Sequence, residues 1–180
     1  MRAAAAGSRV VKPSSRAFRE LLAGSSETIA GTVYGTIIVM ATLVAGAPAF
    51  RDKLWNFFVV VVVTTLVFWA SHIYAHGLAE SLQLGRRLTA PELGRIAHRE
   101  RAIGLAVVLP ALALLLGAVG AFDGSTAVWL ALGLGVAALA VQGVRYARLE
   151  RLSRIGTAVV VGLNLVLGLS IVILKVLVVH

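Results

Sequence analysis

Residues 54–84 read LWNFFVVVVVTTLVFWASHIYAHGLAESLQL, and this stretch decides the fold. Its first part, Leu54 to His76, is almost entirely apolar. A helix of about 20 mostly apolar residues crosses the roughly 30 Å hydrocarbon core of a bilayer, so this part predicts a membrane span. No Pro or Gly follows Gly77 before Leu84. We therefore expect the same helix to continue beyond the membrane surface.

Four other stretches have the same character, and they extend the prediction to the whole chain. They are Thr28 to Ala49, Ile103 to Phe122, Thr126 to Tyr146 and Gly156 to Val179. Of the 180 residues, 59% are hydrophobic and 14% are charged, against about 45–50% and about 25% in soluble domains. Because lipid offers no water to satisfy backbone groups, we expect an all-α polytopic bundle of five spans, with residues 28–180 as one membrane domain.

The basic residues predict the direction of the spans. The chain has 17 Lys and Arg and a net charge of +9. Most of these residues lie before the first span, between spans two and three, and between spans four and five. Since connections rich in Lys and Arg stay in the cytoplasm, we expect a basic cytoplasmic tail over residues 1–27, an external C-terminus and a place in the cell inner membrane. This distribution marks topology, so no nucleic-acid partner is expected.

Several chemistries lack the residues that they need. Cys is absent, which excludes thiolate metal sites, disulfides and Cys nucleophiles. The phosphate loop G-x-x-x-x-G-K-[ST], the G-x-S-x-G elbow and the zinc motif H-E-x-x-H do not occur. The basic and polar residues 1–27 also lack the apolar core of a cleaved signal peptide. We therefore expect a membrane protein that keeps its N-terminus and is not an enzyme.

The connection between spans two and three predicts a cytoplasmic helical hairpin at about residues 77–102. Gly85-Arg86-Arg87-Leu88 indicates a turn, and Thr89-Ala90-Pro91-Glu92 matches a capping box that starts a new helix. This helix is expected to run into span three, with a kink at Pro110. If the hairpin is centred on Arg87, His76 and His98 lie at one height, although their facing angle stays open.

A polar stripe follows one side of the second span. Its members are spaced by three or four positions, which keeps them on one helix face. They are Thr65, Trp69, His72, His76 and Glu80. Ionisable residues at membrane depth are costly and usually face a bundle interior or a watery cavity. The stripe is therefore the best candidate for a functional site.

The stripe supports three interpretations. Two imidazoles one turn apart can bind one metal ion, and a carboxylate and ligands from the other hairpin arm can complete the site. The predicted metal ligands are His72, His76, Glu80, His98 and Glu100, and the metal is Fe, Zn or Mn rather than Cu(I). The same residues can relay protons, since His titrates near neutral pH. In the purely structural interpretation, His72 hydrogen-bonds a neighbouring helix and His76 lies at the headgroup boundary. Glu80 then pairs with Arg95 or Arg99.

Polar and small residues on other spans give weaker signals. Gly31 and Gly35 form a G-x-x-x-G pattern that predicts close helix packing or a dimer interface. Thr32 belongs to a hydroxyl-bearing face that could line an ion path, and Glu27 is either a helix N-terminal charge or a ligand at the mouth of that path. Asn164 is expected to hydrogen-bond another helix. Lys175 is expected to extend to the outer interface.

A resemblance to a known family rests on residues 70–81, ASHIYAHGLAES, on the five-span layout and on the Arg-rich segment before the last span. Together these features resemble the vacuolar iron transporter family. The resemblance implies a second helix that projects into the cytoplasm and transport of iron. The family's acidic ligand within span one falls nearest to Tyr34-Gly35 here, and its Glu-rich cytoplasmic helices correspond to Glu80, Glu92 and Glu100.

Three functions therefore stand as predictions. The first is a divalent metal cation transporter or metal-binding membrane protein, expected to be a homodimer in the lipid bilayer. The second is a proton or monovalent-ion channel that uses Thr65, His72 and the Thr-bearing face of span one. The third is a non-catalytic membrane subunit whose basic cytoplasmic surface contacts anionic lipid or a partner protein.

Overall fold

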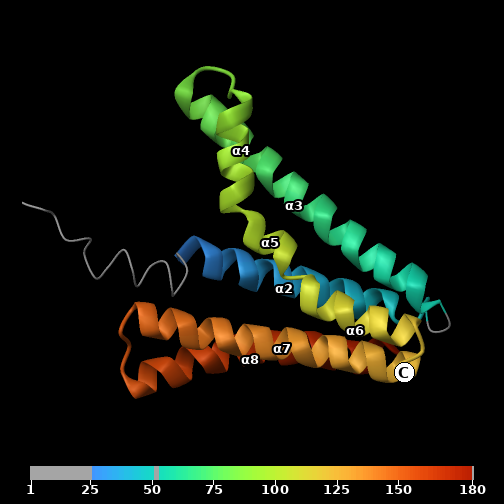
Figure 1. Cartoon of the computed structure of the whole chain (residues 1–180). Coiled ribbons are helices and arrows are strands. Elements are labelled where there is room, and N and C mark those ends of the chain that lie inside the picture. The colour runs from blue at the N-terminus through green and yellow to red at the C-terminus, as the bar shows by residue number, and fades with distance from the viewer. Residues whose placement is uncertain (1–25, 51–52, 180) are drawn as a thin grey trace, which may run out of the picture.

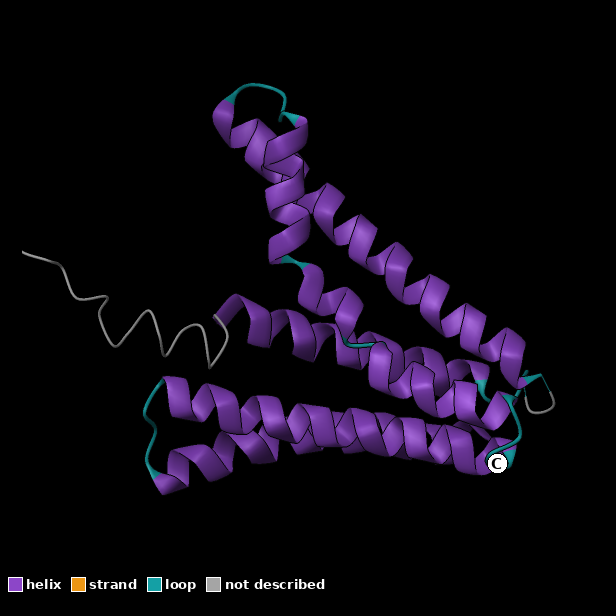
Figure 2. Ribbon diagram, viewed as in Figure 1, coloured by secondary structure: helices purple, strands orange, loops and turns teal. Residues whose placement is uncertain are grey.

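The computed structural model describes residues 26–50 and 53–179, and every regular element in these ranges is a helix (Figure 2). Side chains are described from residue 28 to residue 177, apart from 51 and 52. The predicted cytoplasmic tail therefore lies almost wholly outside the described residues, and so does the side chain of Glu27. The all-α class predicted from the sequence is confirmed.

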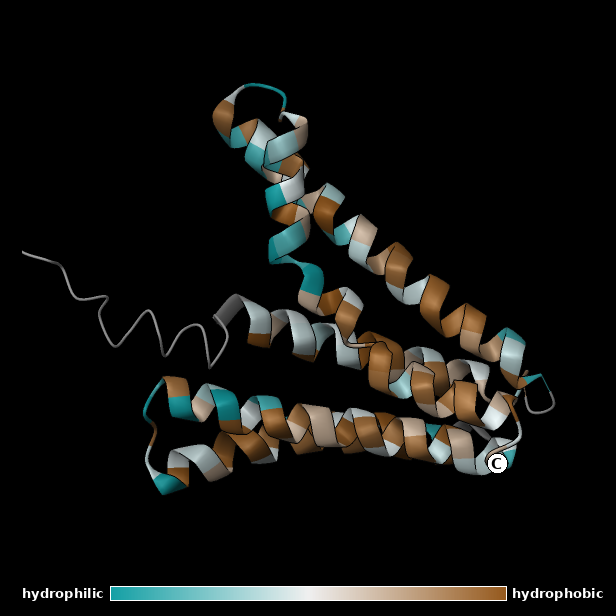
Figure 3. Cartoon of the chain, viewed as in Figure 1, coloured by the Kyte–Doolittle hydropathy of each residue, from teal (hydrophilic) through white to brown (hydrophobic). Residues whose placement is uncertain are grey.

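The helices follow one another along the chain with short connections (Figure 1). They are α2 (Ser26–Gly46), α3 (Leu54–Leu84), α4 (Ala90–Arg99), α5 (Arg101–Leu105), α6 (Val108–Ala118), α7 (Gly124–Leu149) and α8 (Arg154–Val179). Five stretches are long and apolar enough to cross a membrane: Thr28–Gly46, Leu54–Leu84, Arg101–Ala118, Gly124–Leu149 and Arg154–Leu177. This confirms the prediction of a membrane-embedded protein with five candidate spans. In Figure 3, apolar residues dominate the spans, and polar residues gather at the hairpin and at the turn between α7 and α8.

The core lies between α2, α3, α6 and α7. Met40, Leu43, Phe57, Leu114 and Leu132 are each at most 1% exposed and belong to one cluster. In a soluble protein, fully burying such a side chain stabilises the fold by about 1.5–3 kcal/mol. In lipid this gain is absent between helices, so van der Waals packing holds them together. Helix α7 packs against α2, α6 and α8 and so holds the bundle together.

Helix α3 diverges from the other helices toward its C-terminal end, where α4 turns back along it (Figure 1). With 31 residues, α3 is about 46 Å long, well beyond the roughly 30 Å of a bilayer core. It ends at Gly85, whose left-handed φ of 64° suits glycine. The carboxylate of Glu92 then accepts hydrogen bonds from the backbone N–H of Thr89 at 2.8 Å and from its hydroxyl at 2.9 Å. The predicted turn and helix start are confirmed.

The third span is interrupted twice. Pro110 has no N–H to donate to the carbonyl of Ala106, and the chain leaves the α-helix at residues 106 and 107, which confirms the kink predicted there. The second interruption was not predicted, because the sequence favoured one helix running from the hairpin into the membrane. Glu100 adopts φ −85° and ψ 2° between α4 and α5, so its side chain emerges at a joint.

The two glycines of the first span hold α2 against α5. A Cβ atom on Gly35 would lie 2.5 Å from the carbonyl oxygen of Ile103, and one on Gly31 would lie 3.3 Å from the Cβ of Ala102. This confirms the packing role predicted for Gly31 and Gly35. The face is filled by α5 of the same chain, so it is not open to a second copy.

Candidate metal centre

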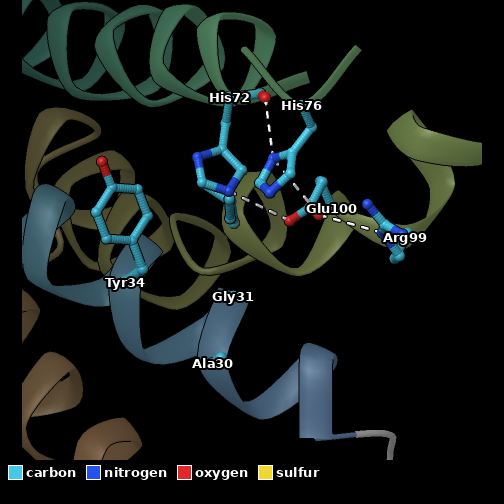
Figure 4. Close-up of a pocket in the computed structure, with 8 residues that line it drawn as sticks. Ala30, Gly31, Tyr34, His72, His76, Arg99 and Glu100 are labelled. Atoms are coloured by element: carbon cyan, nitrogen blue, oxygen red, sulfur yellow. Dashed lines mark hydrogen bonds and ion pairs between the residues drawn. The ribbon is translucent and has the colours of Figure 1, made fainter. Parts of the chain in front are cut away.

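Three side chains from the two arms of the hairpin converge on one point (Figure 4). His72 and His76 are one turn apart on α3, so both imidazoles project from the same helix face. Glu100 comes from the joint between α4 and α5. One ligand atom from each of the three residues lies within 4.8 Å of the other two. The group combines two imidazoles with one carboxylate.

One pair in this group has the spacing of two ligands on a single metal ion. Nε2 of His72 lies 3.5 Å from Oε2 of Glu100, and Nδ1 of His76 lies 3.9 Å from Oε1. Two ligands bound at about 2.05 Å to a tetrahedral zinc ion are separated by about 3.4 Å. The His72–Glu100 pair thus needs almost no movement to share one ion.

The orientation of His76 is fixed by its own helix. Its Nδ1 lies 3.2 Å from the carbonyl oxygen of His72. A carbonyl oxygen only accepts, so in the tautomer in which Nδ1 donates to it the lone pair lies on Nε2, and Nε2 rather than the Nδ1 facing Glu100 is the ligand atom. Metal-binding histidines commonly have this arrangement, because a hydrogen bond from one ring nitrogen sets the other as the ligand. The imidazole centres of His72 and His76 are 4.4 Å apart.

The group lines an open pocket of about 350 Å³ between α2, α3 and the α4–α5 joint. Tyr34 contributes its ring from α2, 5.4 Å from the ring of His72 between centroids. Arg99 contributes a guanidinium whose Nε lies 3.4 Å from Oε1 of Glu100. The pocket residues are Ala30, Gly31, Tyr34, His72, His76, Arg99, Glu100 and Ile103. The site is therefore accessible to a small ion, and one cation of the protein already faces it.

Two of the five predicted ligands lie apart from this group. His98 is exposed at the outer side of α4, because a residue two positions from Glu100 points to a different side of the helix. Glu80 is partly buried one turn beyond His76, and its charge acts on Arg86. The second arm supplies Glu100 and not His98. Arg95 and Arg99, considered as partners of Glu80, instead pair with Glu92 at 3.8 Å and with Glu100 at 3.4 Å.

The two stripe residues on the N-terminal side of His72 face the bundle but do not belong to the group of three ligands. Thr65 is fully buried, and its hydroxyl donates to the carbonyl of Val61 at 2.8 Å. Trp69 packs its indole against Gly104 of α5. Its Nε1 is buried and finds no acceptor among the described residues. The stripe thus marks the inward face of α3, and of its members only the two histidines belong to the candidate metal group.

Two further residues that were predicted to line a path make contacts within the helical bundle. The hydroxyl of Thr32 donates to the carbonyl of Thr28 at 2.8 Å within α2. The side-chain amide of Asn164 lies against Gly143 of α7. Lys175 packs against α7, a contact that the sequence did not predict. It is 8% exposed, and its Nζ lies 3.9 Å from the centre of the Trp129 ring, where the face of the indole stabilises the charge.

Two pocket residues were missed as participants in the site. Arg99 was considered only as a partner for Glu80, and Tyr34 only as a place holder for the acidic ligand of the first span. The i, i+1 relation of Arg99 and Glu100 gave no reason to place them in one pocket, because adjacent residues diverge on a regular helix. The signal would have been a helix break at Glu100.

No family model, curated protein or solved structure matches this chain.

Proposed function

We propose that this membrane protein binds a divalent transition-metal cation at His72, His76 and Glu100 and moves it across the bilayer. The observation that supports the proposal is the convergence of these three side chains from two helices. The resemblance to vacuolar iron transporters points to the same class of activity.

The donor set favours a particular range of ions. Imidazole suits Zn, Fe(II), Ni and Cu(II), whereas Mg²⁺ and Ca²⁺ prefer sites made of oxygen alone. The absence of Cys leaves nothing soft enough for Cu(I) apart from Met. Three protein ligands leave at least one position for water or for a further ligand. This incomplete coordination suits an ion that has to be released.

The setting of the site also supports transport. His72 and His76 belong to the longest candidate span, and Glu100 directly precedes another. Their side chains are 30%, 43% and 13% exposed, so an ion can reach them from the pocket. We propose that this pocket opens to the cytoplasm, with the N-terminus on the same side and the C-terminus outside the cell, in the inner membrane of a prokaryote.

Metal binding tests the proposal most directly. The purified wild type and Glu100→Gln are titrated with Co²⁺ in detergent, and the visible absorption of bound Co²⁺ is recorded. Glu80→Gln is the matched control, since it removes one carboxylate from the same hairpin. We expect wild type and Glu80→Gln to bind and Glu100→Gln to lose most of its affinity. Equal binding by all three would refute the site.

Transport is tested separately in liposomes that contain a metal-sensitive dye. We expect Zn²⁺ or Fe²⁺ to enter vesicles with wild-type protein and Glu80→Gln, and not vesicles with Glu100→Gln. A proton flux that needs no metal and persists in a chelator would favour the channel alternative. Silence in both assays, together with indifference to Glu100→Gln, would favour a non-catalytic subunit.

A further inference from the structure

Arg99 faces the carboxylate that the metal needs. Its Nε lies 3.4 Å from Oε1 of Glu100, the same oxygen that lies 3.9 Å from Nδ1 of His76. We propose that Arg99 is a built-in counter-ion that occupies Glu100 in the empty site and competes with the metal for it. This inference rests on the proposed function of the group.

Arg99 and Glu100 reach the same pocket from adjacent positions. On a continuous helix, neighbouring side chains diverge by about 100° and do not meet. Glu100 has φ −85° and ψ 2° at the end of α4, and both Arg99 and Glu100 line the same pocket (Figure 4). The long side chain of Arg99 nevertheless reaches Glu100, so adjacent positions supply a ligand and its opposing charge.

Charge explains why the empty site needs such a partner. The side chain of Glu100 is only 13% exposed, and a poorly hydrated carboxylate is costly unless a cation or hydrogen bonds compensate it. Of the other cations near this arm in the described chain, Arg95 pairs with Glu92 at 3.8 Å and Arg86 with Glu92 at 2.7 Å. Among the Lys and Arg side chains of the described residues, Arg99 is the one within ion-pair distance of Glu100.

The same contact lowers the affinity for metal. An incoming dication can use Oε2, which faces His72, but the guanidinium on Oε1 repels it until Arg99 turns away. The Arg99 side chain is 43% exposed, so it can turn toward water without losing hydration. Arg99 then returns to Glu100 when the ion leaves. A transporter benefits from this exchange, because a site that binds too tightly does not release its ion.

The test compares Co²⁺ dissociation constants of wild type, Arg99→Gln, Arg99→Lys and Arg95→Gln by calorimetry in detergent. Arg95→Gln is the control, because it removes one positive charge from the same helix at a side chain that is 76% exposed. Partly exposed ion pairs are worth up to about 1 kcal/mol, so we expect Arg99→Gln to bind Co²⁺ more tightly than Arg95→Gln, by up to about fivefold. Arg99→Lys keeps the charge and should stay within about twofold of wild type.

A second readout separates this role from a structural one. Without metal, Arg99→Gln should be no more stable than wild type to thermal unfolding, although it binds metal more tightly. A merely structural arginine would weaken both properties when removed. Binding by Arg99→Gln that is equal to or weaker than that of Arg95→Gln would overturn the inference. Absence of Co²⁺ binding by the wild type as well would instead refute the proposed function.

Discussion

Oε2 of Glu100, at the joint between α4 and α5, lies 3.5 Å from Nε2 of His72 on α3. Through this pair the carboxylate connects the returning arm of the hairpin to α3, and the glycines of α2 hold α5 directly beside it. The geometry of the site therefore depends on how these three helices pack. Substitutions of ligands and substitutions at the helix contacts can therefore test these two contributions separately.

Replacing His98 should leave metal binding intact. His98 is exposed, whereas His76 lines the pocket. Losing a residue that only orients a metal ligand costs about 10- to 100-fold in affinity. Losing a ligand itself should therefore cost on the order of 100-fold. We expect His76→Ala to lose this much and His98→Ala to stay within about twofold of wild type. Calorimetric titration with Co²⁺ or Zn²⁺ measures both, and equal losses would contradict the assignment of Glu100 as the ligand of the second arm.

Replacing Gly35 should loosen the packing beneath the site. An added Cβ would lie 2.5 Å from a backbone carbonyl oxygen of Ile103, which cannot move without α5. We expect Gly35→Ala to destabilise the protein by about 1–3 kcal/mol, as overpacking does, and to weaken metal binding. Unfolding with SDS, followed by circular dichroism, measures the first effect.

Gly94→Ala is the matched control for this change. An added Cβ at Gly94 meets no heavy atom within 4 Å, and alanine is favoured over glycine inside a helix by about 0.5–1 kcal/mol. Gly94→Ala should therefore be as stable as wild type or more so. A loss of stability equal to that of Gly35→Ala would show that the close approach of α2 and α5 is not the cause.

The hairpin tip should keep its structure in mildly acidic solution. The Arg86 guanidinium, helped by hydrogen bonds from Thr89, holds the pKa of the Glu92 carboxyl far below its usual range. A carboxyl with a lowered folded pKa stabilises the fold fully above its unfolded pKa of about 4.3, and this stabilisation is lost as the pH falls through the folded value. We therefore expect no loosening of the tip between pH 8 and pH 5.

Spin labels can check this expectation, because the chain has no cysteines of its own. Labels at Leu82→Cys and Gly94→Cys report the distance between the two arms. The distance distribution should stay narrow from pH 8 to pH 5 in this labelled protein. It should be broader throughout that range once Glu92→Gln is added, since the ion pair with Arg86 is then lost while the capping oxygen remains. A wild-type tip that broadens by pH 5 would argue against the pairing.

The buried Lys175 should be energetically coupled to Trp129. Its Nζ lies 3.9 Å from the centre of the indole ring, and a cation over an aromatic face contributes about 0.5–2 kcal/mol. A double-mutant cycle with Lys175→Met and Trp129→Leu, read out by SDS unfolding, should give a coupling energy in this range. Strictly additive effects would mean that the contact contributes nothing.

Much of the fold could be predicted because the governing signals are local. Apolar length defined the spans, Gly85 and Glu92 defined the turn, and Pro110 marked the kink. The height of the site was also predictable. With Arg87 as the centre of the hairpin, Glu100 lies opposite the midpoint between His72 and His76, which is where the structure has it.

The facing angle was beyond this reasoning. Spacing along a hairpin gives height, while the side of α4 that meets α3 depends on the break at Glu100 and on packing against α2. His98 and Glu100 differ by two positions, so a choice between them is a choice of helix face. The burial of Lys175 was missed for a similar reason, since its partner Trp129 comes from another helix.

The two sides of the centre differ in stiffness. Helix α3 runs without interruption through His72 and His76, so the two imidazoles keep their spacing when the hairpin moves. The opposite arm bends at Glu100 and again near Ala106, so the carboxylate alone can change its distance from them. One small rotation at that joint would therefore carry the carboxylate away from both imidazoles, without unfolding any span.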